Sequence, residues 1–287
     1  MKVGIIAIAR QENLYINEWI DYHLGLGFDT IIICDNNDDD SGEKVSDIIK
    51  NDKVIILDYL NIESVQPRAY TEAFLKYKKG FDWLLFIDID EFVVLEPKYH
   101  NNIKEFLNDS LFEKVDVIRL CWKIYTTNTD LDVINGNYSV VSRFKDIHIS
   151  REENYAKSFI RGSIDYTGGE VTGHGYYENK NLSAVSAGGV PCNNSFQAIC
   201  LDTHDQSIYT NAWINHYPTK TIGEYIRQKY FRGGPNANCR RYSNLSYFYI
   251  YNNKRPEVDE YARKLIKELT SVMVKEKYKK FYRIDDS

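Results

Sequence analysis

The first third of the chain alternates between short apolar runs and segments with helical spacing. The apolar runs predict four strands: Val3–Ala9, Thr30–Cys34, Val54–Leu57 and Trp83–Ile87. The segments between them predict three helices: Leu14–Leu26, Glu43–Lys50 and Arg68–Lys79, the last opened by Pro67. Strands that alternate with helices favour right-handed crossovers. We therefore expect an α/β fold with a mostly parallel sheet covered by helices on both faces.

Polar residues follow each of these strands. They are Arg10 to Glu12, Asp35 to Asn37, Asp58, and Asp88 with Asp90. Ligands of open parallel sheets bind at the carboxyl ends of the strands, so these side chains are candidates for one site. No G-x-G-x-x-G sequence follows any of the four strands, which argues against a dinucleotide-binding fold.

The fourth strand ends in three carboxylates, Asp88, Asp90 and Glu91. Asp88 and Asp90 lie two positions apart, so on an extended backbone they point to the same side. Mg²⁺ and Mn²⁺ bind through one or two carboxylates together with the phosphates of a substrate. The pair thus predicts half of a divalent-metal site, and the alternative is a strand that ends in ordinary acidic turn residues.

Composition narrows the class of protein. The 287 residues are 43% hydrophobic and 27% charged, which suits one large globular domain or one domain with an appendage. The net charge of -5 argues against a general nucleic-acid binder, whose binding domain would be basic. Five cysteines without a C-x-x-C pair argue against a disulfide framework and a thiolate zinc site, and they favour a reducing compartment.

The two ends of the chain give expectations about location. The N-terminal apolar run is too short for a secretory signal, and no run reaches the roughly 20 residues that span a bilayer, so we expect a cytoplasmic protein. The tail Glu257–Arg283 has helical spacing and a basic end. Most such tails pack on the core, and a second hypothesis is peripheral contact with the inner face of the membrane.

Five blocks along the chain form a joint pattern: Ala9–Asn13, Glu18–Leu24, Cys34–Asn37, Phe86–Phe92 and Asn215–Lys220. In order and spacing they resemble glycosyltransferases of the GT-A fold, most closely the bacterial family-2-like proteins related to glycosyltransferase family 92. The resemblance covers most of the chain. Relatives often carry a Trp-x-x-Phe-Gly block after the fifth strand, where this chain has Trp122–Thr126.

The resemblance implies an enzyme that binds a nucleotide-sugar donor, usually a uridine diphosphate (UDP) sugar, and a divalent metal, Mn or Mg, on the Asp-x-Asp sequence. The sugar would pass with inversion to a hydroxyl of an acceptor glycan or glycolipid, and we expect a hexosyltransferase of surface polysaccharide synthesis. The GT-A domain would comprise residues 1–256, with a nucleotide-sugar-binding half at 1–97 and an acceptor side with a diphosphate-closing loop at 98–256. Residues 257–287 would form a helical tail.

The resemblance also assigns residues to the donor site. Around the base and ribose it implies the residues that follow the first strands and open the third helix: Arg10, Glu12, Asp35, Asp58, Gln66 and Arg68. For the metal it implies Asp88, Asp90 and His216. We prefer Asp90 as a direct ligand, with Asp88 at the metal, its water or the donor ribose. Glu91 is expected to support these ligands or to contact the sugar.

The diphosphate and the acceptor hydroxyl require further groups. Lys220 would bind phosphate at the start of a helix that Thr219 or Thr221 caps and that runs to Arg232, a second phosphate contact. The catalytic base must be a carboxylate or a histidine, and it falls in a stretch without a clear pattern. From the candidates in that stretch we choose Glu170 and Asp205, ahead of Asp165, His174 and Asp202.

Two other functions fit part of the pattern. A nucleotidyltransferase would share the sheet and the metal carboxylates, but it would need a glycine-rich, basic loop after the first strand, which this sequence lacks. A carbohydrate-binding protein that has lost activity would keep the fold, but Asp88, Asp90, His216 and Lys220 together argue against it. We therefore predict a metal-dependent glycosyltransferase.

Overall fold

The computed structural model describes residues 1–37, 44–62, 65–127, 130–133, 136–148, 155–176, 182–192, 209–232 and 244–282. These residues form two compact units. Unit 1 comprises the described residues up to Tyr125 and from Ile147 to Pro218, and unit 2 comprises the other described residues. The division of the chain at residues 97 and 256 stays a prediction from the sequence.

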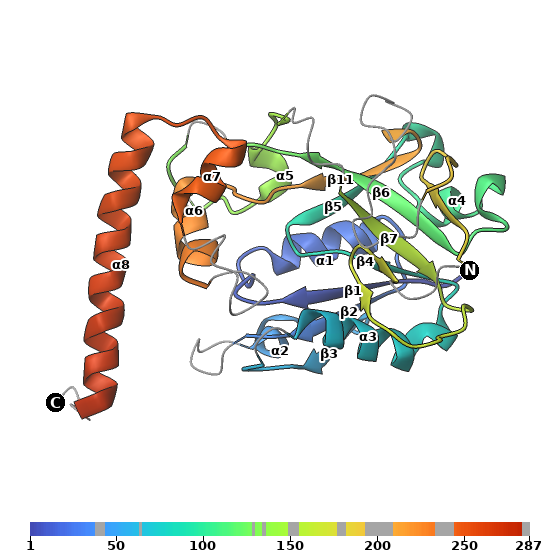
Figure 1. Ribbon diagram of the computed structural model, residues 1–287, viewed down its shortest axis with the longest axis horizontal. Helices are drawn as coiled ribbons and strands as arrows, with labels where there is room; N and C mark the ends of the chain where they lie inside the picture. The colour runs from blue at the N-terminus through green and yellow to red at the C-terminus, as the bar shows by residue number, and fades with distance from the viewer. Residues whose placement is uncertain are drawn as a thin grey trace. The chain divides into compact units, whose positions relative to one another are not determined.

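Unit 1 is built on one mixed sheet (Figure 1). Within the described ranges its nine strands run in the order β3-β2-β1-β4-β7-β6-β11-β5, with β10 paired to β6. Their bounds are β1 Val3–Ala9, β2 Thr30–Asp35, β3 Val54–Asp58, β4 Trp83–Phe86, β5 Glu91–Leu95, β6 Val117–Ile124, β7 Ala156–Arg161, β10 Ala184–Ser186 and β11 Ala212–His216. Five pairs are parallel, whereas β7 runs antiparallel to both neighbours and β5 antiparallel to β11. The expected mostly parallel α/β sheet is confirmed.

Helices cover both faces of this sheet. They are α1 (Ile16–Gly25), α2 (Val45–Ile48), α3 (Gln66–Tyr77) and α4 (Ile103–Leu107), and a short hairpin joins β8 (Val171–Thr172) to β9 (Gly175–Tyr176). Figure 1 shows α1 and α3 on opposite sides of β1. Pro67 lies in the first turn of α3, where its missing N–H is not needed. Phe74 of α3 then packs in a buried cluster with Ile6 and Phe86 of the sheet.

The fourth strand ends one residue earlier than the sequence predicts. β4 stops at Phe86, and the Glu91 N–H donates to the Asp88 carbonyl oxygen at 3.1 Å across a turn. The chain turns here because β5 begins at Glu91 and pairs with β11, not with a neighbour of β4. Asp88 and Asp90 therefore lie on a turn, which corrects the prediction of an extended backbone.

The described part of unit 2 is helical. Its helices are α5 (Val140–Arg143), α6 (Ile222–Tyr225), α7 (Leu245–Tyr251) and α8 (Pro256–Tyr282), and α6 continues through a π-helical segment, Ile226–Tyr230, to Arg232. The Thr221 hydroxyl caps α6 by accepting a hydrogen bond from the Glu224 N–H at 3.3 Å. The predicted helix up to Arg232, with Thr221 as its cap, is confirmed.

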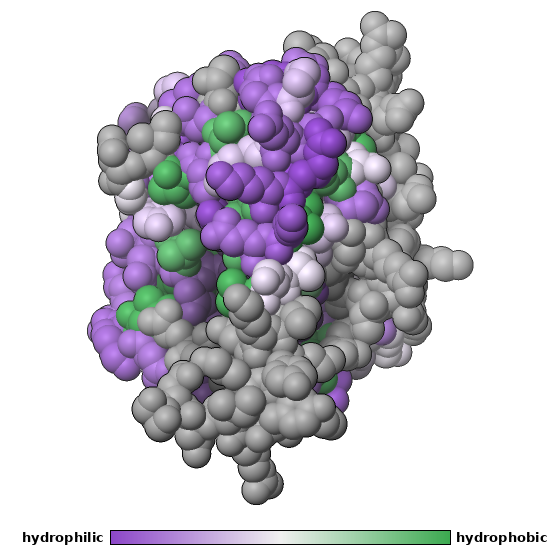
Figure 2. Space-filling model, turned by 90° about the vertical axis from the view of Figure 1, so that its left-hand side faces the viewer, coloured by the Kyte–Doolittle hydropathy of each residue, from purple (hydrophilic) through white to green (hydrophobic). Residues whose placement is uncertain are grey.

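The C-terminal helix α8 has two unlike faces. Val258, Ala262 and Leu265 are buried at the spacing of an amphipathic helix. Figure 2 shows mainly hydrophilic side chains on the surface of residues 256–273 of α8 that faces the viewer. The predicted helical tail is confirmed.

In the part of the chain that the structure describes, we find no helix with the length and apolarity needed to span a bilayer.

Among the described residues, Cys121 of β6 is disulfide-bonded. Cys34 and Cys192 carry free thiols. The odd number of cysteines that argues against a disulfide framework therefore does not exclude a single bond.

Candidate functional site

The turn after β4 carries the first acidic side chain of the site, Asp88. Its Oδ2 atom lies 2.7 Å from the Nζ atom of Lys157 on β7. Its Oδ1 atom accepts hydrogen bonds from Gln66 Nε2 at 3.1 Å and from the Tyr70 hydroxyl at 3.2 Å, so one face of α3 holds the carboxylate. Desolvation alone would raise the pKa of Asp88, but the Lys157 ammonium outweighs it and holds the pKa below its usual value.

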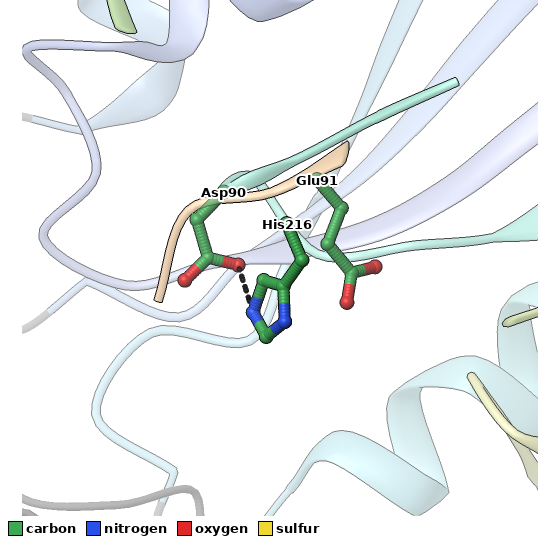
Figure 3. Close-up of side chains that lie close together, drawn as sticks. All are labelled: Asp90, Glu91 and His216. Carbon is green, nitrogen blue, oxygen red and sulfur yellow. Dashed lines mark ion pairs between the residues drawn. The ribbon is translucent and has the colours of Figure 1, made fainter. Parts of the chain in front are cut away.

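Three buried side chains, Asp90, Glu91 and His216, meet beside this turn (Figure 3). The antiparallel register of β5 and β11 sets Glu91 opposite His216. His216 Nε2 lies 3.6 Å from Asp90 Oδ1, and one donor atom from each of the three residues lies within 4.8 Å of the other two. Figure 3 shows the two carboxylates on either side of the imidazole ring. Strand pairing thus joins residues from distant parts of the sequence into one group of oxygen and nitrogen ligands.

The two carboxylate oxygens of Glu91 have different surroundings. Oε2 accepts a hydrogen bond from the Asp88 N–H at 3.0 Å and lies 3.5 Å from Lys157 Nζ. Oε1 is buried, and none of the described residues donates a hydrogen bond to it. Burial raises the pKa of Glu91 well above its usual value, although Lys157 opposes the shift. A buried carboxylate oxygen without a donor is unfavourable by itself and marks a place where a cation fits.

Lys157 is the residue of this group that sequence analysis missed. Its side chain is only 2% exposed and lies on β7 between the buried residues Ala156 and Ser158. Burial alone would lower the pKa of Lys157, but Asp88 and Glu91 outweigh it and raise the pKa, so the ammonium stays charged. The sequence did contain a sign of this role, since Lys157 stands inside an apolar, strand-like run. Charged residues are rarely buried without a partner, so a lysine at such a position indicates an acidic partner nearby.

Aromatic rings border the carboxylates. The Trp122 ring on β6 lies 4.3 Å from the His216 ring, 5.4 Å from the Tyr155 ring and 5.7 Å from the His174 ring, measured between centroids. Burial, followed by the charge of Lys157, lowers the pKa of His174 to about 4, so this imidazole is neutral near pH 7. The rings form an apolar wall beside the acidic group, which suits a ligand with an apolar ring face.

The predicted base and ribose residues after β1 and β2 lie at adjacent strand ends. Ala9 pairs with Asp35 in the parallel register, so Arg10 and Glu12 follow β1 beside the end of β2. The Asp35 carboxylate accepts hydrogen bonds from the N–H groups of Asn37 at 3.1 Å and Val45 at 2.8 Å, which orders the approach to α2. The structure therefore brings these residues together at the edge of the sheet that the sequence predicts.

The predicted donor residues near α3 separate onto two faces of the helix. Gln66 reaches Asp88, whereas Arg68 donates to Glu72 at 2.8 Å and its side chain is 65% exposed. Two positions along a helix correspond to a rotation of about 200°, so Gln66 and Arg68 cannot both face the acidic turn. Asp58 and Arg68 instead line a hollow of about 430 Å³ together with Glu72.

The predicted phosphate-binding residues, Lys220 and Arg232, belong to unit 2. Lys220 is buried and has a left-handed backbone, with φ of 54°, directly before the cap of α6. Arg143 of α5 donates to both carboxylate oxygens of Glu224, at 2.9 Å and 2.7 Å, and so holds the first turn of α6. The binding of phosphate by Lys220 and Arg232 stays a prediction.

The residues chosen as catalytic base do not join the acidic group in the described ranges. Glu170 is exposed directly before β8, and Asp205 lies outside the described residues. Of the other candidates, Asp165 is exposed and Asp202 also lies outside the described residues. His174 alone among these five candidates is described next to the acidic group, through its contact with Trp122.

Comparison with known proteins matches this chain to one family. The model of glycosyltransferase family 92 matches residues 6–178, which include the acidic turn, Trp122 and Lys157. A glycosyltransferase family 92 protein of Oryza sativa subsp. japonica is 30% identical over 90 residues, which make up 31% of this chain and 15% of the rice protein. The matched segment is therefore a small part of that relative.

Solved structures align with the chain at low scores. The 4-diphosphocytidyl-2C-methyl-D-erythritol synthase of Anaerococcus prevotii has 11% identity and a TM-score of 0.34 over 72% of this chain and 94% of its own. The mannose-6-phosphate isomerase of Helicobacter pylori has 16% identity and a TM-score of 0.30 over 46% of this chain and 53% of its own. Scores at this level carry no argument about function. The family model, in contrast, covers more than half of the sequence, and this protein belongs to glycosyltransferase family 92.

Proposed function

We propose that this protein is a glycosyltransferase that transfers a hexose from a UDP-sugar to a hydroxyl of an acceptor glycan or glycolipid, with inversion, and that it depends on Mn²⁺ or Mg²⁺. The observation that carries the proposal is the buried group of Asp90, Glu91 and His216, which strand pairing draws together at the end of the acidic turn. UDP as the nucleotide, inversion and a place in surface polysaccharide synthesis are supported by the sequence resemblance alone.

The side chains of this group fit a divalent cation. Carboxylate oxygens with one imidazole nitrogen are ligands that suit Mn²⁺, and Mg²⁺ shares the preference for oxygen. Glu91 Oε1 is buried and receives no hydrogen bond from the described residues, so a cation would satisfy it. Asp90, Glu91 and His216 would hold the metal. When bound, it would stabilise the negative charge that develops on the departing diphosphate.

The protein's own residues would orient the sugar and keep water away. Gln66 and Tyr70 fix the Asp88 carboxylate through hydrogen bonds, and Trp122 offers an apolar ring surface beside His216. The acceptor hydroxyl must give its proton to a base. Glu170 and Asp205 stay the proposed bases, with His174 as the described alternative beside the Trp122 ring.

Donor turnover tests the proposal. The purified protein, incubated with a panel of UDP-sugars and an acceptor glycan, should release UDP only when Mn²⁺ or Mg²⁺ is present, and a chelator should stop the release. The anomeric configuration of the product, read by NMR, tests inversion. Release of pyrophosphate would instead support a nucleotidyltransferase, and turnover that a chelator leaves unchanged would refute the metal dependence.

A further inference from the structure

Lys157 is a buried cation set between two of the three carboxylates. Its Nζ atom lies 2.7 Å from Asp88 Oδ2 and 3.5 Å from Glu91 Oε2. The backbone of the β8–β9 hairpin approaches the ammonium closely, since a Cβ atom at Gly173 would lie only 2.8 Å from Nζ. Glycine at this position leaves the lysine the space that it occupies.

The charge of the acidic group explains why a lysine is needed here. Asp88, Asp90 and Glu91 carry three negative charges when all are ionised, and a buried charge is tolerated when it is paired. One ammonium lowers this total to two negative charges, which is the amount that one divalent cation neutralises. Without the lysine, the group would retain an excess negative charge even with the metal bound.

We propose that Lys157 is a positioning residue that divides the carboxylates between two cations. The ammonium holds Asp88 and the Oε2 atom of Glu91, and it leaves Asp90, His216 and the Oε1 atom of Glu91 for the divalent metal. Asp88 then serves as the partner of Lys157 and not as a metal ligand. This inference rests on the metal site of the proposed function and extends it to a residue outside the Asp-x-Asp sequence.

A purely structural lysine would respond differently to substitution. If Lys157 only tied β7 to the acidic turn, its loss would loosen the group, and metal affinity would fall together with stability. If Lys157 acts through its charge, its loss leaves one more negative charge around the metal, and metal affinity rises. The sign of the change in affinity therefore separates the two roles.

The direction of the change in Mn²⁺ affinity is measured in the absence of donor and at one fixed ionic strength. Titration calorimetry and the electron paramagnetic resonance signal of free Mn²⁺ both give the dissociation constant. We expect Lys157→Met to bind Mn²⁺ at least tenfold more tightly than the wild-type protein. Lys123→Met is the matched control, because it removes a half-buried lysine of the neighbouring strand β6 whose ammonium lies 3.6 Å from the centre of the Trp213 ring. This control should leave the dissociation constant unchanged.

Asp88 supplies the decisive comparison. Asp88→Asn removes one negative charge, so Mn²⁺ should bind at least tenfold more weakly. This single variant does not separate the two roles, because the loss of a metal ligand would also weaken Mn²⁺ binding. The double variant Asp88→Asn/Lys157→Met restores the wild-type charge and should return the dissociation constant to within about threefold of the wild-type value. A double variant that binds as weakly as Asp88→Asn would overturn the inference and make Asp88 a ligand.

Melting temperatures show which variants are folded. The double variant buries no uncompensated charge from this pair, so it keeps the test decisive even if Lys157→Met does not fold. Folded Lys157→Met that binds Mn²⁺ equally or more weakly than the wild-type protein would overturn this inference alone. A wild-type protein that binds no Mn²⁺ would overturn the proposed metal dependence, and this inference with it.

Discussion

Replacing Arg143 by Met should destabilise unit 2 by about 3 kcal/mol, because the change removes the guanidinium that pairs with the buried Glu224 carboxylate. The two side chains are 8% and 3% exposed. The guanidinium donates to both carboxylate oxygens, at 2.9 Å to Oε2 and 2.7 Å to Oε1. A bidentate pair that is shielded from water in this way is among the stronger ion pairs in proteins.

The size of the loss follows from the hydrogen bonds that Glu224 keeps. Removing one partner of a buried ion pair costs about 3 to 5 kcal/mol. In Arg143→Met, Glu224 Oε2 still accepts hydrogen bonds from the Thr221 N–H at 3.0 Å and the Thr221 hydroxyl at 2.7 Å. These bonds keep the carboxylate partly satisfied, so we expect the lower end of the range. A loss of about 3 kcal/mol corresponds to a population of the opened state that is roughly a hundredfold larger.

Hydrogen exchange measures this effect where it should occur. The four tryptophans, Trp19, Trp83, Trp122 and Trp213, all belong to unit 1, so their fluorescence does not report directly on unit 2. The amides of residues 222–232 in Arg143→Met should exchange roughly a hundredfold faster than in the wild-type protein.

The double variant Arg143→Met/Glu224→Leu is the control for this prediction. It removes both charges, and an apolar replacement of a buried pair is often close to neutral. The loss of the Thr221 capping partner should then account for a cost of about 1 kcal/mol. Equal losses of protection in the single and the double variant would refute the reasoning, because the damage would then not come from the Glu224 charge that Arg143 balances.

Three further predictions concern the metal, the packing and the pH dependence. Asp90→Ala should abolish Mn²⁺-dependent UDP binding in calorimetry, and a cooperative thermal transition shows that the variant is folded. Asp52→Ala, in an exposed turn, is the control that should leave UDP binding unchanged. Full activity in Asp90→Ala would mean that the metal assignment is wrong. Gly162→Ala should lower the free energy of unfolding by about 3 kcal/mol, because its Cβ atom would overlap the carbonyl oxygens of Phe81 and Lys78. The control Gly80→Ala has open space around its Cβ atom among the described residues, so its free energy of unfolding should stay close to that of the wild-type protein. Equal urea midpoints for the two variants would contradict the prediction. Burial lowers the pKa of His23 from 6.5 to about 3. Between these two pH values the unfolded chain binds a proton at His23 that the folded protein does not bind. The free energy of unfolding should therefore fall on acidification below pH 6.5, by up to about 1.4 kcal/mol per pH unit. Urea unfolding of the wild-type protein and of His23→Gln across this pH range measures the slope of the free energy of unfolding against pH. If the substitution leaves this slope unchanged, His23 is not its cause.

The first half of unit 1 could be predicted from the sequence because its signals are local. The strands that begin at Val3, Thr30, Val54 and Trp83 start where the apolar runs start, since three of these runs fill buried strands and the run at Val54 fills the half-buried strand β3. The helix predicted over Arg68–Lys79 begins at Gln66, one residue before Pro67. The segment predicted as helix Glu43–Lys50 is shorter in the structure, where α2 spans Val45–Ile48 and Glu43 lies outside the described residues.

The second half of unit 1 could not be predicted in this way because its pairings join distant segments. β7 lies antiparallel between β4 and β6, and this arrangement alone brings Lys157 to the acidic turn. The sequence of β7 carries no sign of which strands will flank it. The division of Gln66 and Arg68 between two faces of α3, by contrast, follows from the helical period and could have been inferred from the sequence once the helix was predicted.

The two aspartates of the Asp-x-Asp sequence are not equivalent in this fold. Their spacing would make them equivalent on an extended strand, where both side chains share one side. On the turn, Asp88 meets Lys157 and the start of α3, while Asp90 meets His216. A cation that approached Asp88 would have to displace an ammonium at 2.7 Å, and that displacement would leave Lys157 buried without its closest partner. The sequence therefore determines which positions are acidic, and the pairing of β7 and β11 with the rest of the sheet determines which cation each acidic side chain can bind.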